Sequence, residues 1–452
     1  MATPPSLWWP PEPVKPRPVL TGDRTVDVAI VGAGFTGLWT ARELLRRDPT
    51  LSIALVEKHY AGFGASGRNG GWVSALFPLG DEAVQRRHGE DAWRHQRDGL
   101  RDAVANFGAA LADDGIEGDF VRGGTLTFAR SALQRERLRN NIDDGDEWLE
   151  GEALQDRGVV AGALGALFSP HCARIHPGKV VRQLAQRVEQ LGATIYEDSP
   201  VTAIRPRRGR RLAEVVTVSG TVRATYVVRA TEGYSATFPG HRRDVAPVYS
   251  LMVATAPLPQ SFWDEYGFHT MPTFADDRNL IIYGQRTADN RIAFGGRGAP
   301  YHFGSTIEDR FDHVEKVFRA LESTLRELFP TLDVPFTHHW GGPLAMPRRR
   351  EPSVVVDQTS GLAHAGGYTG DGVTLSRVCG EALADLITRP TETTAATQLP
   401  FVQSSFKKWE FEPARWLGIN AGLSLATRAD EYEQQQGREG WPHSLLRRLL
   451  GE

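Results

Sequence analysis

The chain of 452 residues is long enough for two or three domains, and 40% apolar with 24% charged residues is typical of a globular enzyme. A formal net charge of −3 implies no affinity for nucleic acids or anionic membranes. Two cysteines, Cys172 and Cys379, are too few for a disulfide framework or a cysteine metal site, so we expect a reducing, cytoplasmic compartment. Because no apolar run reaches roughly 18 residues and no basic-then-apolar leader opens the sequence, we expect neither a membrane span nor a secretory signal.

Residues 1–25 are rich in proline, which predicts an extended, polyproline-like arm rather than a domain. Trp8 and Trp9 are too apolar for a free tail. We therefore predict that they dock on the body of the protein.

Residues 26–38 have the pattern of a buried strand, a glycine turn and the start of a helix. Gly32, Gly34 and Gly37 follow the G-x-G-x-x-G spacing, which permits a tight turn, close approach to a pyrophosphate, and close packing of helix on strand. The free N–H groups and the dipole of that helix favour phosphate charges. The next strand, residues 51–56, ends at Glu57, whose carboxylate can accept hydrogen bonds from a ribose. This combination predicts a site for an adenine dinucleotide.

Residues 62–71 contain five glycines, a density that excludes a helix or a regular strand. Such a loop lets the backbone approach a flat or charged ligand, with Ser66, Arg68 and Asn69 as polar contacts. A flexible surface loop is the alternative, but the neighbouring Trp72 argues against it.

The remaining pattern alternates helices and strands. Helices are predicted over residues 82–115, 131–155, 177–191 and 306–329, and from the end of the motif at Thr374 to Ile387, with further amphipathic helix beyond residue 398. Strands are predicted over residues 120–129, 194–197, 201–204, 215–218, 222–230, 245–257 and 279–297, the last range folding into a hairpin at residues 288–290.

The first glycine motif and the string G-x-G-A-S-G-R-N-G-G together resemble the FAD-dependent D-amino-acid-oxidase superfamily. The chain is most similar to its γ-glutamylputrescine oxidase branch, with glycine oxidase and monomeric sarcosine oxidase as more distant relatives. The resemblance implies an α/β fold with a Rossmann-like FAD-binding domain of the GR2 type, discontinuous in sequence, and a second α+β substrate domain built on an antiparallel sheet. It implies FAD-binding segments at 26–80, 165–240 and 341–390, substrate-domain segments at 81–164 and 241–340, and a C-terminal helical segment at 391–452.

The resemblance also implies which residues contact FAD. The implied contacts are Gly32, Gly34, Phe35, Thr36, Gly37, Glu57, Lys58, Gly64, Ala65, Ser66, Arg68, Asn69, Gly70, Gly71, Val201, Ala230, Thr231, Gly367, Gly370, Asp371, Gly372, Val373 and Thr374.

The family ends its FAD domain in a turn of small residues followed by a helix, as at residues 362–387. The N–H groups and dipole of that helix would stabilise the negative charge of reduced flavin. Asp371 stands where many relatives carry histidine, and Thr374 where some carry lysine. Residues 340–348 lack the cysteine to which sarcosine oxidases attach their flavin, so we expect FAD to be held without a covalent bond.

The implied reaction oxidises the C–N bond of a small-molecule amine or amino acid to an imine, which hydrolyses to an aldehyde or keto acid. Flavin is then reoxidised by O2, giving H2O2. Substrate placement matters more than an acid–base residue, so we expect no catalytic triad; the catalytic candidates are Arg68, Tyr283, Arg297 and Arg348. Arg286 and Arg291 are further pocket candidates. Arginines there would favour a carboxylate-bearing substrate, whereas acids such as Asp276 or Asp277 at the mouth would favour a polyamine-like one.

Three alternatives stay open. Sarcosine oxidase uses a lysine to activate O2, and residues 291–294 lack it, so a dehydrogenase that passes electrons to a carrier or quinone is possible. A flavin monooxygenase would consume NAD(P)H, and a non-catalytic relative would only bind FAD. The sequence leaves the oligomeric state open.

Overall fold

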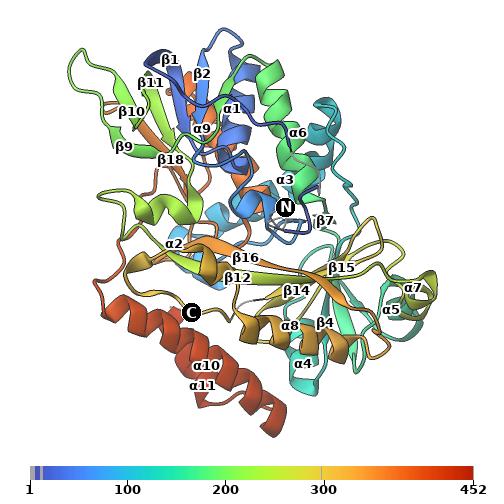
Figure 1. Ribbon diagram of the computed structural model, residues 1–452. Coiled ribbons are helices and arrows are strands. Elements are labelled where there is room, and N and C mark those ends of the chain that lie inside the picture. Colours follow the sequence, from blue (N-terminus) through green and yellow to red (C-terminus); the bar gives the residue numbers. More distant parts are fainter. Residues whose placement is uncertain (1–5, 11–13, 297, 451–452) are drawn as a thin grey trace.

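The first of two large sheets has a mainly parallel core. The computed structural model describes residues 6–10, 14–296 and 298–450. The strand order is β17-β18-β11-β1-β2-β8, with β9 and β10 joined at the side of β11 (Figure 1). β18, β11, β1, β2 and β8 run parallel, and β17 is antiparallel to β18. The strands are β1 (Arg24–Val31), β2 (Ile53–Val56), β8 (Thr194–Tyr196), β9 (Val201–Arg205), β10 (Ala213–Thr217), β11 (Thr221–Arg229), β17 (Ser353–Asp357) and β18 (Leu362–Gly366).

Helices cover one face of this sheet. They are α1 (Phe35–Arg47), α3 (Glu90–Asp113), α6 (Pro177–Gln190) and α9 (Gly372–Thr388), and α1 packs against both α6 and α9. Every residue of β2 and the last four of β1 are buried, as expected for parallel strands covered on both faces. The core on the helical side joins these strands to the apolar faces of the four helices.

The second sheet is antiparallel except where β13 pairs with β4. Its order is β16-β12-β15-β14-β13-β4-β6-β5. Its strands are β4 (Thr125–Ala129), β5 (Glu147–Leu149), β6 (Gly165–Ser169), β12 (Val245–Thr255), β13 (Thr273–Asp276), β14 (Ile282–Arg286), β15 (Ile292–Gly296) and β16 (Phe336–Pro347). The helices of this half are α4 (Ala132–Asn140), α5 (Gly151–Arg157), α7 (Gln260–Tyr266) and α8 (Glu315–Leu328), and the last three contribute to an aromatic core.

Smaller elements join the halves. Strands β3 (Trp72–Ser74) and β7 (Cys172–Arg174) pair with each other, and the 3₁₀ turns η1 (Ala65–Gly67), η2 (Glu232–Thr237), η3 (Phe303–Ser305) and η4 (Asp309–Asp312) lie in loops. Helices α10 (Ala414–Gln436) and α11 (Trp441–Leu450) pack together below the second sheet, and α2 (Asp81–His88) precedes α3 (Figure 1). The predicted fold class, a discontinuous α/β dinucleotide-binding unit with an α+β unit on a largely antiparallel sheet, is confirmed.

Several predicted element bounds were wrong. Gly89, with φ of +88°, breaks the helix expected over 82–115 into α2 and α3. The range 131–155 contains α4, strand β5 and α5, because residues 147–149 pair with β6. The expected helix 306–329 begins only at Glu315, the C-terminal helix begins at Ala414, and only residues 125–129 of the range 120–129 form a strand. Gly165–Ser169 pairs in the second sheet rather than with the FAD-binding segments, and the domain boundaries otherwise stay a prediction.

The prediction that the aromatic residues of the arm dock on the body is confirmed. The side chains of Trp8 and Trp9 are 2% and 9% exposed. Within the described ranges, no helix has both the length and the apolar character needed to cross a membrane.

Candidate functional site

A large cavity opens where the parallel strands of the first sheet end. It occupies about 1340 Å³ including its open mouth, and it is lined from β1, α1, β2, η1, η2, β16 and the start of α9. Segments far apart in sequence therefore build one space at the carboxyl ends of the strands, where α/β folds bind ligands.

The first glycine motif forms one wall, and each glycine has a separate structural reason. Gly32 has φ of +104°, and a Cβ there would lie 2.5 Å from the carbonyl oxygen of Ala230. Gly37 lies behind the wall, where a Cβ would lie 2.1 Å from the carbonyl oxygen of Gly32, so it lets α1 pack close to β1. Gly34 has an ordinary φ of −84°, yet a Cβ would lie 2.9 Å from Ser66 Oγ within the cavity lining. The backbone does not require glycine at position 34, but a Cβ there would displace the Ser66 side chain that lines the cavity.

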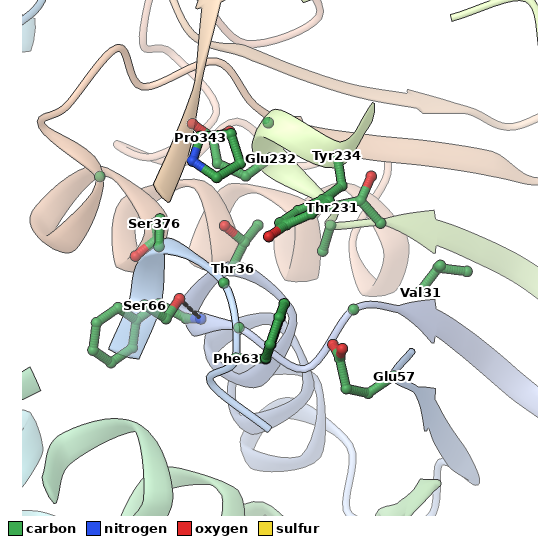
Figure 2. Close-up of a pocket in the computed structure, with 18 of the residues that line it drawn as sticks. Val31, Thr36, Glu57, Phe63, Ser66, Thr231, Glu232, Tyr234, Pro343 and Ser376 are labelled. Carbon is green, nitrogen blue, oxygen red and sulfur yellow. Dashed lines mark hydrogen bonds between the residues drawn. The ribbon is translucent and has the colours of Figure 1, made fainter. Parts of the chain in front are cut away.

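The start of α1 faces the same cavity. The Phe35 backbone N–H donates to Ser66 Oγ at 2.8 Å, and no acidic side chain lies in the first turn of α1 (Figure 2). The positive end of the helix dipole is therefore not neutralised by the first turn's own side chains, and it suits a pyrophosphate.

Glu57 marks the other end of the cavity, at the end of β2. Its two carboxylate oxygens accept the backbone N–H groups of Ala33 and His59, each at 2.9 Å. These bonds fix the carboxylate, and each oxygen retains acceptor capacity for a ribose hydroxyl. Burial raises the pKa of Glu57.

The opposite wall comes from η2 and from β16 of the second sheet. Figure 2 shows Thr231, Glu232, Tyr234 and Pro343 across the cavity from Ser66 and Phe63. Four features of the cavity fit an adenine dinucleotide with a flat ring system. They are the space left by the glycines, the N-terminal end of α1, the hydrogen-bonded Glu57 carboxylate, and the apolar wall from η2 and β16. The Thr374 hydroxyl at the start of α9 is buried without a hydrogen-bond partner among the described residues.

A second cavity of about 1330 Å³, again including its mouth, adjoins the first. Its walls include Trp72, Phe77, Ile281 and Tyr283, with Arg350 among the polar groups. Both cavities are lined by Ala65, Asn69, Leu344, Gly370 and Val373, so they meet there. A ligand in the second cavity would therefore touch the end of a dinucleotide in the first.

Most of the predicted cofactor residues line the first cavity. Those that do are Gly32, Gly34, Phe35, Thr36, Glu57, Lys58, Gly64, Ala65, Ser66, Asn69, Val201, Ala230, Thr231, Gly370, Gly372 and Val373. Arg68, Gly70 and Asp371 line the second cavity, whereas Gly37, Gly71, Gly367 and Thr374 stand behind the walls of both. Their contacts with a cofactor stay a prediction.

The structure places the predicted catalytic candidates in different environments. Tyr283 lines the second cavity and its hydroxyl bonds Ser250 Oγ at 2.9 Å. Arg68 lines it too, but its side chain is 7% exposed and pairs with Asp312, and its guanidinium lies 4.5 Å from the centre of the Phe63 ring. Arg297 lies outside the described residues.

The other charged candidates have structural partners. Arg348 lines neither cavity and pairs with Glu410 at 2.9 Å. Arg286 stacks on Trp263 in the aromatic core, and Arg291 pairs with Asp289. The acids proposed for a polyamine mouth are also paired, Asp276 with Arg278 and Asp277 with Arg137.

Glu232 is not among the predicted site residues, yet it ties three segments together. Its carboxylate accepts the N–H groups of Ala345 at 3.3 Å, Gly367 at 2.8 Å and Tyr368 at 3.3 Å. Burial raises the pKa of Glu232 to about 7 although these three bonds oppose it. Its position three residues after the end of strand β11 was the available signal, but its partners lie more than 100 residues away.

Residues 27–386 match the family model described as FAD dependent oxidoreductase, DAO. The probable oxidoreductase OrdL of Rhizobium meliloti is 28% identical over 387 residues, covering 82% of this chain and 84% of its own. The γ-glutamylputrescine oxidoreductase of Escherichia coli is 26% identical over 384 residues, covering 82% and 86%. Glycine oxidase from Geobacillus kaustophilus has a similar fold, with a TM-score of 0.71 and 23% identity over 84% of this chain and 99% of the other. The predicted family is thus confirmed: the chain belongs to the DAO family of FAD-dependent oxidoreductases.

Proposed function

We propose that this chain is an amine or amino-acid oxidase. It oxidises a C–N bond to an imine, which water hydrolyses to an aldehyde or keto acid with release of ammonia or an amine. The observation that carries the proposal is the meeting of two cavities at Asn69, Leu344 and Val373. The first cavity suits FAD along its length, and the second gives a small molecule access to its flavin end. When bound, FAD supplies the two-electron acceptor for this chemistry.

The residues of the second cavity contribute placement and desolvation. Trp72, Phe77 and Ile281 present apolar surface, which disfavours an ammonium group and lowers the pKa of a bound amine. A neutral amine is the form that can be oxidised at its C–N bond. Tyr283 adds a hydroxyl, held by Ser250, that can orient a polar substrate group.

The start of α9 supports the oxidation electrostatically. Gly370, Gly372 and Val373 bring its backbone N–H end to the junction of the cavities. A helix N-terminus favours negative charge, so it would stabilise a cofactor that has gained electrons.

The choice of electron acceptor rests on cations near the junction. Among the described residues that line the two cavities, the one lysine is Lys58, which lies beside Glu57 at the ribose end. Two arginines line the second cavity: Arg68, which is paired with Asp312, and Arg350. The lack of a lysine among the described residues lining the junction favours, as a second candidate function, a dehydrogenase that passes electrons to a carrier or quinone.

One experiment tests both candidates. FAD-loaded protein is mixed without oxygen with a panel of primary amines, secondary amines and amino acids, and flavin absorbance is followed. We expect at least one compound to bleach the flavin, and air then restores the colour with H2O2 in an oxidase. Recovery only with an artificial acceptor supports the dehydrogenase. Absence of bleaching across the panel, or bleaching only by NAD(P)H, would overturn the proposal. A cytoplasmic location stays part of this proposal.

A further inference from the structure

The glycine-rich loop at the junction of the two cavities is held from behind by side chains of other segments. Four consecutive carbonyl oxygens each accept one side-chain hydrogen bond from outside the loop. The pairs are Ser6 Oγ to Gly67 at 2.8 Å, Trp340 Nε1 to Arg68 at 2.8 Å, Trp8 Nε1 to Asn69 at 2.8 Å, and Gln285 Nε2 to Gly70 at 2.6 Å. Two of the four donors belong to the N-terminal arm.

The arm is itself firmly seated. Its Trp8 ring packs edge-on against Trp340 and His176, with centroid distances of 6.2 and 5.1 Å. The Trp8 carbonyl accepts a hydrogen bond from Arg182 at 3.1 Å. A Cβ at Gly178, in the first turn of α6, would lie 2.1 Å from that carbonyl oxygen, so α6 leaves room for the arm at this point.

The cavity side of the same loop carries the groups predicted to contact FAD. Ser66 and Asn69 line the first cavity, and the Asn69 amide also bonds the carbonyls of Ala65 and Ser66 at 3.0 and 2.9 Å. A loop with this many glycines loses much conformational freedom when it is ordered. Bonds that order it before the ligand arrives raise affinity without touching the ligand.

We propose that residues 6–9 act as a positioning element for the FAD-binding loop, with Ser6 and Trp8 fixing the Gly67 and Asn69 carbonyls so that the opposite side of the loop is pre-formed for the cofactor. The arm is then a working part of the cofactor site and not only a covering of apolar surface. The inference rests on the proposed position of FAD in the first cavity.

The adjacent tryptophan provides a matched control. Trp9 is also buried and packs on Tyr60 at 4.6 Å, but its indole N–H has no hydrogen-bond partner among the described residues. Trp8→Phe and Trp9→Phe therefore make the same chemical change, and only the first removes a bond to the loop.

The test has two readouts. In the apoprotein, hydrogen–deuterium exchange across residues 64–71 should speed up in Trp8→Phe and in Ser6→Ala, and stay at the wild-type rate in Trp9→Phe. The Kd for FAD should rise about five- to tenfold in Trp8→Phe and less than twofold in Trp9→Phe. Ser6→Ala keeps the test decisive if Trp8→Phe does not fold.

Equal exchange and equal Kd in all three variants and wild type would overturn the positioning role, as would equal losses in Trp8→Phe and Trp9→Phe. Failure of the proposed function is distinguishable from this. In that case no amine or amino acid bleaches the flavin, whereas the exchange and Kd comparisons still report whether the arm orders the loop and favours FAD binding.

Discussion

Substitutions of two glycines of the first motif, Gly37 and Gly34, should separate an effect on protein stability from an effect on FAD binding. In Gly37→Ala the new Cβ would lie 2.1 Å from the Gly32 carbonyl oxygen and 3.1 Å from Ile30 Cγ2, so α1 must move away from β1. Overpacking against backbone at this distance should cost about 3 kcal/mol or more. In Gly34→Ala the Cβ meets only Ser66 Oγ at 2.9 Å, and a turn of that side chain gives up its bond from the Phe35 N–H. That change should cost about 1 kcal/mol.

The assay compares thermal midpoints of the apoproteins with FAD affinity measured by flavin fluorescence. Gly37→Ala should lower the midpoint by about 3 °C or more. Gly34→Ala should shift it by about 2 °C or less while raising the Kd for FAD about tenfold or more, because its methyl occupies the cavity wall. If Gly37→Ala melts at the wild-type temperature, or Gly34→Ala binds FAD as wild type does, the separate roles given to these glycines are wrong.

Three further changes probe the site. Because the folded-state pKa of Glu232 is raised to about 7 from 4.5, folding retains a proton that the unfolded chain releases, and this group's contribution to stability falls as pH rises from about 5 to 7. The thermal midpoint of the apoprotein should therefore fall less between about pH 5 and pH 7 in Glu232→Gln than in wild type. An equal pH dependence of the midpoint in the two proteins would contradict this assignment. Asp312→Asn leaves the buried Arg68 guanidinium without its carboxylate and should lower the free energy of unfolding by about 3 kcal/mol. An unchanged melting midpoint would show that this ion pair does not stabilise the fold. Tyr283→Phe removes the bond to Ser250 and should lower kcat/KM for the bleaching amine while leaving the Kd for FAD unchanged, so a loss of FAD binding would refute its assignment to the second cavity.

Local patterns predicted the parts of the site that are built from neighbouring residues. The strand, turn and helix at residues 24–47 and the carboxylate ending β2 depend on backbone conformation and packing within about 30 residues, so spacing alone identified them. The docking of Trp8 and Trp9 could be predicted from the large apolar surface of their side chains alone.

The parts that the sequence missed depend on partners far along the chain. Glu232 gains its importance from N–H groups of β16 and the turn after β18, and Arg68 is neutralised by Asp312, 244 residues away. Arg348 carries the charge expected of a substrate contact, but Glu410 holds it elsewhere. The local pattern predicts helix at residues 147–149, but these residues form strand β5, because pairing with β6 decides their conformation.

The central claim is that segments from both sheets form one cavity that holds FAD without a covalent bond. Titration of the apoprotein with FAD, followed by heat denaturation and removal of the precipitate, tests it most directly. We predict saturation at one FAD per chain, with all of the flavin recovered as FAD in the supernatant. A chain that binds no FAD, or flavin that stays attached to the denatured polypeptide, would contradict the account.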